Sequence, residues 1–414
     1  MTMRMLVTSA AIVIICLTLA APGRARASTL EPTLESRADG PRVPVRDDEV
    51  LETLPRQLLE SRGEIQRMRR ELAARPGDAE LAARVAGELV RLARASDDPR
   101  LFGHARAAIA RWWDDPAAPS AVLLIRAKLK ETDHEYRAAL ADLELLLARK
   151  PGQLPAMQVQ ALVETASVAL VMADFERATS AADALERVAG PMQAVFARAP
   201  VLARTGRAGE AYDLYGRQLA ELRERMPGVV AWVETARGEI AEMLGRLEEA
   251  ERHYRAALAA DQSDRYLMRA LADFLLDRGR APEAMALLEK HTADTGVLLA
   301  YAIAGKRSGN AEIARRSTAE LTARFDAIRL RQGTRHLRFE SRYELELGGN
   351  PARALELARQ SWAEQKEPRD ARNVLEAALA AGDAGAANQV IEFMAQSRIE
   401  DVRLRELAAR LGAR

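Results

Sequence analysis

Apolar residues recur at helical spacing from about Val50 to the C-terminus, in segments of helix length that short polar turns interrupt. Few segments show the alternation of β-branched and polar residues that is typical of strands. Ala, Leu, Arg and Glu are abundant, and these residues lose little conformational freedom in a helix. The pattern therefore predicts an all-α protein.

A six-residue motif, Gly-Arg-x-x-Glu-Ala, occurs at 206–211, 245–250 and 279–284. Looser copies lie upstream and downstream, and their final alanines follow one another at intervals of about 30 to 40 residues. A recurrence of this size indicates stacked supersecondary units. The nine final alanines are Ala105, Ala139, Ala178, Ala211, Ala250, Ala284, Ala314, Ala354 and Ala387.

Each residue type of the motif has a physical role in a hairpin of two helices. Glycine takes the left-handed conformation that ends the first helix. Glutamate interacts favourably with the N-terminal end of the second helix. Alanine lies where the two helices approach closely, and a larger side chain would push them apart. The motif is thus expected to mark the turn of a helix pair, and it is not a phosphate-binding loop.

With these positions the chain resembles the tetratricopeptide-repeat (TPR) family. In that family a small residue in the first helix precedes an Ala-x-x-x-Phe pattern in the second. Here Gly238 occupies the small position, and Ala250 is followed by Tyr254. The resemblance is best over 231–291 and extends over about 78–395. It implies a right-handed superhelical solenoid of antiparallel helix pairs.

The chain also departs from the family pattern. The family's tryptophan is generally missing, and Thr318 and Ala358 stand where a large apolar residue is usual. Pro200 falls inside an expected first helix, where it would remove a backbone hydrogen bond and kink or shorten the helix. These departures do not change the expected architecture, but they affect how many repeats can be counted.

The sequence divides into four segments. Residues 1–27 are expected to be a signal peptide, and 28–48, with three prolines and scattered charges, a flexible leader. Residues 49–400 are expected to form a TPR-like array of about nine helix pairs. Residues 401–414 are expected to form a helix that caps the array, because the last repeat of a solenoid needs a polar outer face.

The first segment has the features of a secretory signal. Arg4 precedes an uncharged run over 5–21, and the Ala-Arg-Ala tripeptide at 25–27 forms a cleavage site before Ser28. We therefore expect export, with a periplasmic location. An uncleaved membrane anchor is an alternative, because the run approaches the roughly 18 residues that a span needs. Lipidation at Cys16 is disfavoured by the isoleucines that precede it.

Cleavage would leave a nearly neutral chain without cysteine. Cys16 is the single cysteine, so disulfides and thiolate sites are not expected in the mature chain. Loss of three arginines from a formal charge of +1 gives −2. This charge provides no global attraction to nucleic acid or to an anionic membrane. No second apolar run is long enough to span a bilayer. Neither nucleic-acid binding nor a membrane span in the mature chain is therefore expected.

No catalytic, cofactor or metal motif is complete. The His-Glu pair at 134–135 begins like a zinc-protease motif, but Ala138 stands where the second histidine must be. Residues 305–307 lack the Ser or Thr that follows the lysine of a nucleotide loop. Acidic pairs at 97–98 and 114–115 adjoin prolines, as turn and cap residues do. We therefore expect no cofactor, no metal and no enzyme activity.

An array of helix pairs has an extended concave surface lined by the first helices. Aromatic residues and charges of both signs there suit a protein or peptide segment. They do not resemble the Lys/Arg/Asn clamp with which some family members hold a C-terminal carboxylate. The candidate partner-binding residues are Trp232, Glu239, Tyr266, Arg269, Asp273, His336, Phe339, Tyr343, Arg372 and Glu376.

The sequence thus predicts a non-catalytic exported scaffold that binds a protein or peptide partner in the cell envelope. Two hypotheses of other classes stay open. The chain could be the helical-repeat domain of an enzyme that acts on cell-wall polymer, which would need a cleft with paired carboxylates. It could also be a self-assembling structural spacer, because self-association is compatible with the array.

Overall fold

The computed structural model describes residues 56 to 412, apart from 97, 99, 150–154 and 331–335. In these residues every regular element is a helix, and no strand is present. The predicted all-α class is therefore confirmed. The expected signal peptide and flexible leader lie outside the described residues.

The first half of the described chain contains ten α-helices and two 3-10 helices. They are α1 (Arg56–Ala74), α2 (Ala79–Ser96), α3 (Arg100–Ala108), η1 (Ala110–Trp112), α4 (Ser120–Thr132), α5 (Tyr136–Leu147), α6 (Pro155–Val171), α7 (Phe175–Ala189), α8 (Pro191–Arg204), α9 (Ala208–Arg225), η2 (Pro227–Val229) and α10 (Val230–Met243).

The second half of the described chain contains ten more α-helices and three shorter elements, of which η4 is a π-helical turn. They are α11 (Leu247–Ala260), α12 (Arg265–Asp277), α13 (Ala281–Leu288), η3 (Glu289–His291), α14 (Thr295–Arg307), α15 (Ala311–Leu330), α16 (Leu337–Tyr343), η4 (Glu344–Gly348), α17 (Pro351–Glu364), α18 (Pro368–Ala381), η5 (Ala384–Ala387), α19 (Asn388–Ser397) and α20 (Val402–Gly412).

Consecutive helices from α2 to α19 form pairs, and each pair packs against the next one along the chain. Most members of a pair are joined by short turns, as in a helical-repeat solenoid. The apolar cores follow this order. One cluster extends from α1 to α6, a second from α6 to α10, a third from α10 to α16 and a fourth from α17 to α20. No pair therefore buries its apolar side alone.

Eight of the nine turns share one backbone conformation. Five residues before the motif's alanine, the chain takes a left-handed φ, and from Gly206 to Gly382 this position is always glycine. The exception is the pair of α2 and α3, where the position before Ala105 is Arg100, the first residue of α3. In two earlier pairs the same position is held by His134, with a φ of 63°, and by Ala173, with a φ of 60°. A side chain at such a φ costs roughly 1–2 kcal/mol. The motif therefore marks the helix turn, as the sequence predicted.

The motif's alanines lie at the closest contacts between paired helices. Eight of the nine are fully buried, and Ala314 is half-buried. In the pair that contains Ala314, the small residue is Gly305 of α14, where a Cβ would meet the Ala314 backbone nitrogen at 3.3 Å. Gly238 of α10 is also close to its partner helix, since a Cβ there would lie 2.8 Å from the Tyr254 ring. Small residues thus set the distance between the helices.

Pro200 lies inside α8, which continues for four residues beyond it to Arg204. The proline therefore does not end the helix. It instead forms part of the wall of a cavity that is described below.

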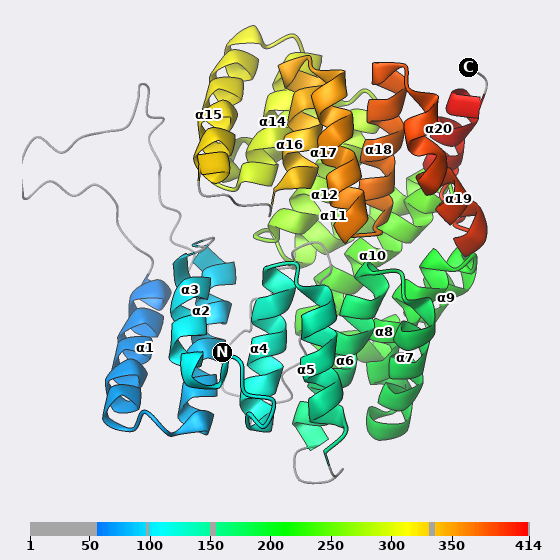
Figure 1. The fold of residues 1–414 in the computed structure, drawn as a ribbon. Coiled ribbons are helices and arrows are strands. Elements are labelled where there is room, and N and C mark those ends of the chain that lie inside the picture. Colours follow the sequence, from blue (N-terminus) through cyan, green and yellow to red (C-terminus); the bar gives the residue numbers. More distant parts are fainter. Residues whose placement is uncertain (1–55, 97, 99, 150–154, 331–335, 413–414) are drawn as a thin grey trace, which may run out of the picture.

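The row of helices turns back on itself. Figure 1 shows α1 to α9 in one row and α14 to α20 in a second row above it, with α10 to α12 between them. We call α16 to α20 the C-terminal arm and the helices from α1 to α15 the array. The arm ends with α20, which packs on α18 and buries Leu404, Leu407 and Leu411.

Replacing Ala173 by glycine tests the strain in the turn between α6 and α7. Ala173→Gly removes the Cβ that disfavours a left-handed φ, so we expect the free energy of unfolding to rise by about 1 kcal/mol. The matched control is Ala256→Gly at an exposed position inside α11, where glycine lowers stability by about 1 kcal/mol. Thermal melting followed by circular dichroism should give opposite shifts in Tm for the two variants, and a lowered Tm for Ala173→Gly would contradict this account.

Candidate functional site

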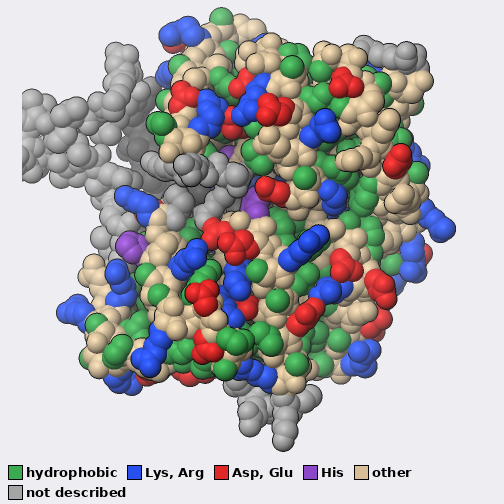
Figure 2. Space-filling view, in the orientation of Figure 1, with side chains coloured by type: hydrophobic (Ala, Val, Ile, Leu, Met, Phe, Trp, Pro, Cys, Tyr) green, Lys and Arg blue, Asp and Glu red, His purple; other side chains and the backbone are tan. Residues whose placement is uncertain are grey.

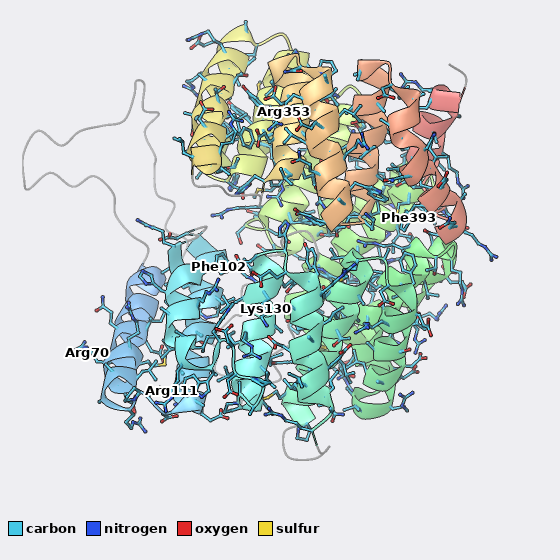
Figure 3. The ribbon with its side chains drawn as sticks, in the orientation of Figure 1. Arg70, Phe102, Arg111, Lys130, Arg353 and Phe393 are labelled. Atoms are coloured by element: carbon cyan, nitrogen blue, oxygen red, sulfur yellow. The ribbon has the colours of Figure 1, made fainter. Side chains whose placement is uncertain are left out.

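The C-terminal arm contacts helices that lie far earlier in the chain. The Lys366 backbone N–H donates to the Val171 carbonyl at 2.8 Å, and the Ala208 N–H donates to the Glu400 carboxylate at 2.6 Å. Phe393 of α19 packs against Phe175 of α7, with 6.3 Å between ring centroids. Figure 3 shows Phe393 at this junction between the two rows. These contacts close the row of helices around its inner face.

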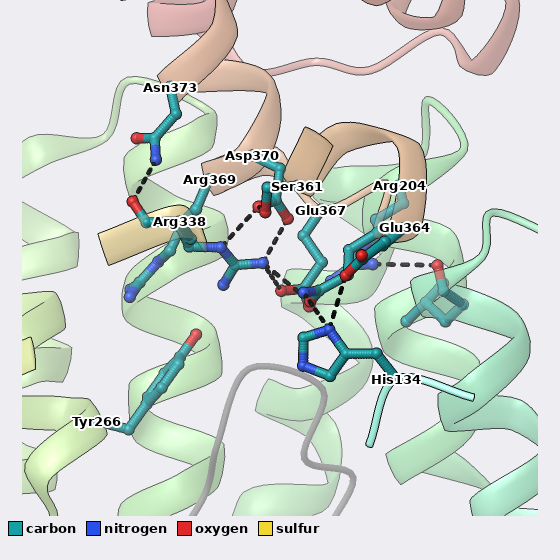
Figure 4. Close-up of polar contacts among 12 residues, drawn as sticks. His134, Arg204, Tyr266, Arg338, Ser361, Glu364, Glu367, Arg369, Asp370 and Asn373 are labelled. Atoms are coloured by element: carbon teal, nitrogen blue, oxygen red, sulfur yellow. Dashed lines mark hydrogen bonds and ion pairs between the residues drawn. The ribbon is translucent and has the colours of Figure 1, made fainter. Parts of the chain in front are cut away.

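A buried cluster of ion pairs holds part of this junction (Figure 4). Arg338 of α16 donates to Asp370 at 2.8 Å and to Glu367 at 2.6 Å, and Glu367 also accepts from Arg204 of α8 at 3.2 Å. Burial would lower the pKa of Arg338, but the neighbouring carboxylates of Asp370 and Glu367 raise it above its usual value. The arm is thus joined to α8 through the carboxylate of Glu367, which both Arg338 and Arg204 contact.

His134 adds a contact from the turn between α4 and α5. Its Nδ1 lies 3.0 Å from the Glu364 carboxylate at the end of α17, and its ring stacks on Tyr136. The residue that replaces the usual turn glycine therefore contacts the arm. Strained backbone positions of this kind persist where surrounding contacts hold them.

A cavity of about 270 Å³ lies where the arm meets the array. Its walls come from α6, α8, α9, α10, α12 and α14 on one side, and from α16, α18, α20 and the segments before them on the other. Seven of the ten candidate residues line it. They are Trp232, Glu239, Tyr266, Arg269, Asp273, Phe339 and Arg372.

The other three candidate residues lie outside the wall of the cavity. Glu376 is one turn beyond it and accepts hydrogen bonds from Arg372 at 2.9 Å and from Arg403 at 3.0 Å. His336 lies just before α16, with its ring 6.1 Å from that of Phe339. Tyr343 lies in the core, and its expected position is different.

The expected surface position of Tyr343 is wrong. This residue is 8% exposed and belongs to the core between α15 and α16, where its ring lies 5.2 Å from Phe325. Its hydroxyl is 2.7 Å from the Thr322 hydroxyl of α15. The long α15 covers this end of α16, so that the side chain faces the core and not the inner surface.

One part of the cavity wall is aromatic. Trp232 of α10 contacts Tyr215 of α9, with 5.8 Å between rings at a nearly right angle, and Phe196 of α8 at 5.4 Å. Tyr215 is 1% exposed, and its hydroxyl has no hydrogen-bond partner. Tyr215 follows Ala211 by four residues, so the Ala-x-x-x-Phe pattern of the second helix places it at a packing position. An unpaired buried hydroxyl is costly, and this one belongs to a residue of the cavity wall.

The opposite part of the wall is polar and centres on one face of α12. Tyr266, Arg269 and Asp273 project from this face at i, i+3 and i+7. The Tyr266 hydroxyl donates to Glu239 at 2.6 Å, and Arg369 of the arm donates to the same carboxylate at 2.9 Å. The Arg369 guanidinium also lies 4.7 Å above the Tyr266 ring.

Sequence reasoning found Arg372 but missed the other four arginines that the arm brings to the cavity. Arg342 pairs with Asp273 at 2.7 Å, and Arg338, Arg369 and Arg403 also line the wall. The repeat alignment identified Phe339 of α16 and Arg372 of α18, but not the arginines beside them on these helices. Nothing in the local pattern showed how far the arm folds back, and this distance decides which side chains reach the cavity.

The remaining surface gives few further indications. Figure 2 shows basic and acidic side chains interspersed over the face that it displays. Within the described ranges, no group of three or more His, Cys, Asp or Glu residues is placed to hold a metal ion. Among the helices that the structure describes, none combines the length and the apolar composition that crossing a bilayer requires.

Comparison with known proteins gives a likeness in fold alone. No protein-family model and no curated protein matches the sequence. Three solved structures align with 86% of this chain: yeast Tom70 (11% identity, 96% of that chain, TM-score 0.32), a Rap protein complexed with competence and sporulation factor (14%, 98%, 0.45) and the P58(IPK) TPR domain (16%, 95%, 0.22). At these values the TPR-like fold rests on the helix pairs and turns of this chain.

Glu242 in the cavity wall predicts a pH dependence of stability. Burial raises its pKa from 4.5 to about 6, although the Tyr254 hydroxyl donates to it at 2.7 Å. The folded state therefore binds more protons than the unfolded state between these two values, and its stability falls as pH rises through them. We expect the free energy of unfolding of the wild type, relative to Glu242→Gln, to drop by about 1 kcal/mol from pH 4.5 to pH 6.5 in urea titrations. A difference that stays constant with pH would contradict the raised pKa.

Replacing Asp277 tests how much ion pairs contribute to the contact between the C-terminal arm and the array. It accepts two hydrogen bonds of 2.9 Å from Arg372 and pairs with Arg403, so it joins α12 to α18 and α20. Asp277→Asn removes the charge and should speed amide hydrogen exchange in α18 and α20, but not in the distant α4. The matched control is Glu356→Gln, which breaks a more exposed pair with Arg353. Equal exchange in both variants would show that Asp277 does not hold the arm.

Proposed function

We propose that this chain is an exported TPR-like scaffold that binds a protein or peptide partner in the cell envelope and catalyses no reaction. The observation that carries the proposal is the cavity between arm and array, whose wall combines aromatic rings with charged groups of both signs. Interface cores are enriched in Tyr, Trp, Phe, Met and Arg, and all five residue types line this cavity.

The volume of the cavity also suits part of a larger partner. Ligand cavities that bury a whole drug-sized molecule usually measure about 300–1,000 Å³. A cavity of about 270 Å³ falls just below this range and accommodates one or two side chains of a partner. The rest of the partner would then lie on the surrounding helices. Such a central pocket ringed by weaker contacts is typical of binding hot spots.

The location in the envelope is supported by the first 27 residues of the sequence. The basic residue, the apolar run and the small-x-small site before Ser28 are the parts of a cleavable secretory signal. An exported scaffold of this kind would meet its partner after translocation.

A capture experiment tests this function. The full chain with a C-terminal tag is produced in its own organism, cross-linked in the intact envelope and purified. We expect one or a few protein partners, and a captured chain whose N-terminus is Ser28. Trp232→Ala, in the cavity, should reduce recovery of the partner about tenfold or more, because a tryptophan that a partner covers is a frequent hot spot.

The matched control is Trp113→Ala, which truncates another half-buried tryptophan that lies outside the cavity wall, under Arg106. Recovery with this variant should equal that of the wild type. Equal recovery with both tryptophan variants would place the partner elsewhere on the chain, and recovery of no partner at all would contradict a scaffold function.

A further inference from the structure

Three arginines of the cavity wall keep hydrogen-bond donors without a partner among the described residues. In the described residues, Arg269 of α12 pairs with an acidic side chain at 3.0 Å, Arg342 of α16 with one at 2.7 Å and Arg369 of α18 with one at 2.9 Å. A guanidinium carries five N–H donors, so each of these side chains retains several after it has bonded to one carboxylate. Arg269 is 9% exposed, and its Nε has no hydrogen-bond partner. The three side chains can therefore donate to a further acceptor.

The geometry of these donors points to a carboxylate on the ligand. A carboxylate matches the planar fork of a guanidinium, which binds it through two parallel hydrogen bonds. Seven arginines and six acidic residues line the cavity, and three of the arginines also pair with acidic side chains outside its wall. A group with two negative charges would therefore meet stronger repulsion from these acidic residues than a single carboxylate does.

The aromatic part of the wall points to an apolar neighbour of that carboxylate. Trp232 and Tyr215 form a surface that an apolar side chain can cover. The buried Tyr215 hydroxyl, which has no partner, can donate to a peptide carbonyl of the same ligand. The unused donors and the aromatic surface line one cavity, so a single short segment can reach both.

We propose that the cavity binds an internal peptide segment of the partner in which an acidic side chain lies next to an apolar one. The carboxylate binds among Arg269, Arg342 and Arg369, and the apolar side chain packs on Trp232 and Tyr215. This assignment rests on the proposed function. Because Arg342 and Arg369 belong to the arm and Arg269 to the array, the bound carboxylate joins the two.

The test uses two blocked pentapeptides, acetylated at the N-terminus and amidated at the C-terminus so that the side chain supplies the only carboxylate. One has the sequence Gly-Leu-Glu-Phe-Gly, and in the other glutamine replaces the glutamate. Calorimetric titration of the full mature chain at pH 7.5 should show at least tenfold tighter binding of the glutamate peptide, as a charge-assisted hydrogen bond provides.

Two variants locate the binding. Arg369→Gln should abolish the preference for glutamate, and its fold is protected because Glu239 keeps the hydrogen bond from Tyr266. The matched control is Arg353→Gln, since the two arginine side chains are 32% and 35% exposed and Arg353 lies outside the cavity wall. Figure 3 shows Arg353 on α17, away from the junction. The control should keep the full preference.

Tyr215→Phe is the second variant, and it removes a hydroxyl that makes no hydrogen bond, so it should fold at least as well as the wild type. We expect it to bind the glutamate peptide about fivefold more weakly. Equal binding of the two peptides, binding of neither, or a preference that survives Arg369→Gln would each overturn the proposal. A partner captured through Trp232 but without a glutamate preference would leave the proposed function standing and remove this inference alone.

Discussion

The structure depends on the close approach of two helices at a small residue that follows a left-handed turn. In the pair formed by α10 and α11, Gly238 and Ala250 let the helices meet, and the ring of Tyr254 fills the remaining space. This contact fixes the angle at which each pair presents its next apolar face. Each helix pair then stacks on the next one along the chain. This stacking places the first helices of the pairs on the inner surface.

Closure of the arm on the array has an electrostatic cost. Burying charges requires that each one be paired and hydrogen-bonded, because desolvation otherwise exceeds the attraction. Arg338 satisfies this condition with Glu367 and Asp370, and the inner faces of α8 and α12 supply further partners. Polar pairs of this kind favour one relative position of arm and array over others. An apolar contact of the same area would specify that position less strictly.

Local features of the sequence predicted the repeat and much of the cavity. The spacing of the alanines located the helix pairs, and the face of α12 that carries Tyr266, Arg269 and Asp273 does line the cavity. Two turns were less visible in the sequence, because His134 and Ala173 stand where glycine was expected. Apart from Arg372, the arginines of the arm could not be assigned, since their positions depend on contacts between helices that are distant in the chain.

The return of the arm has a consequence for how the molecule unfolds. In an open solenoid each repeat interacts with its neighbours only, so the ends can fray while the middle persists. Here the last helices also touch α6, α7 and α9, through Lys366, Phe393 and Glu400. Loss of a terminal repeat would therefore expose surface in the middle of the chain as well. The helices from α6 to α20 therefore form a closed loop of contacts, and adding or removing a helix pair within it would move the arm away from α6, α7 and α9.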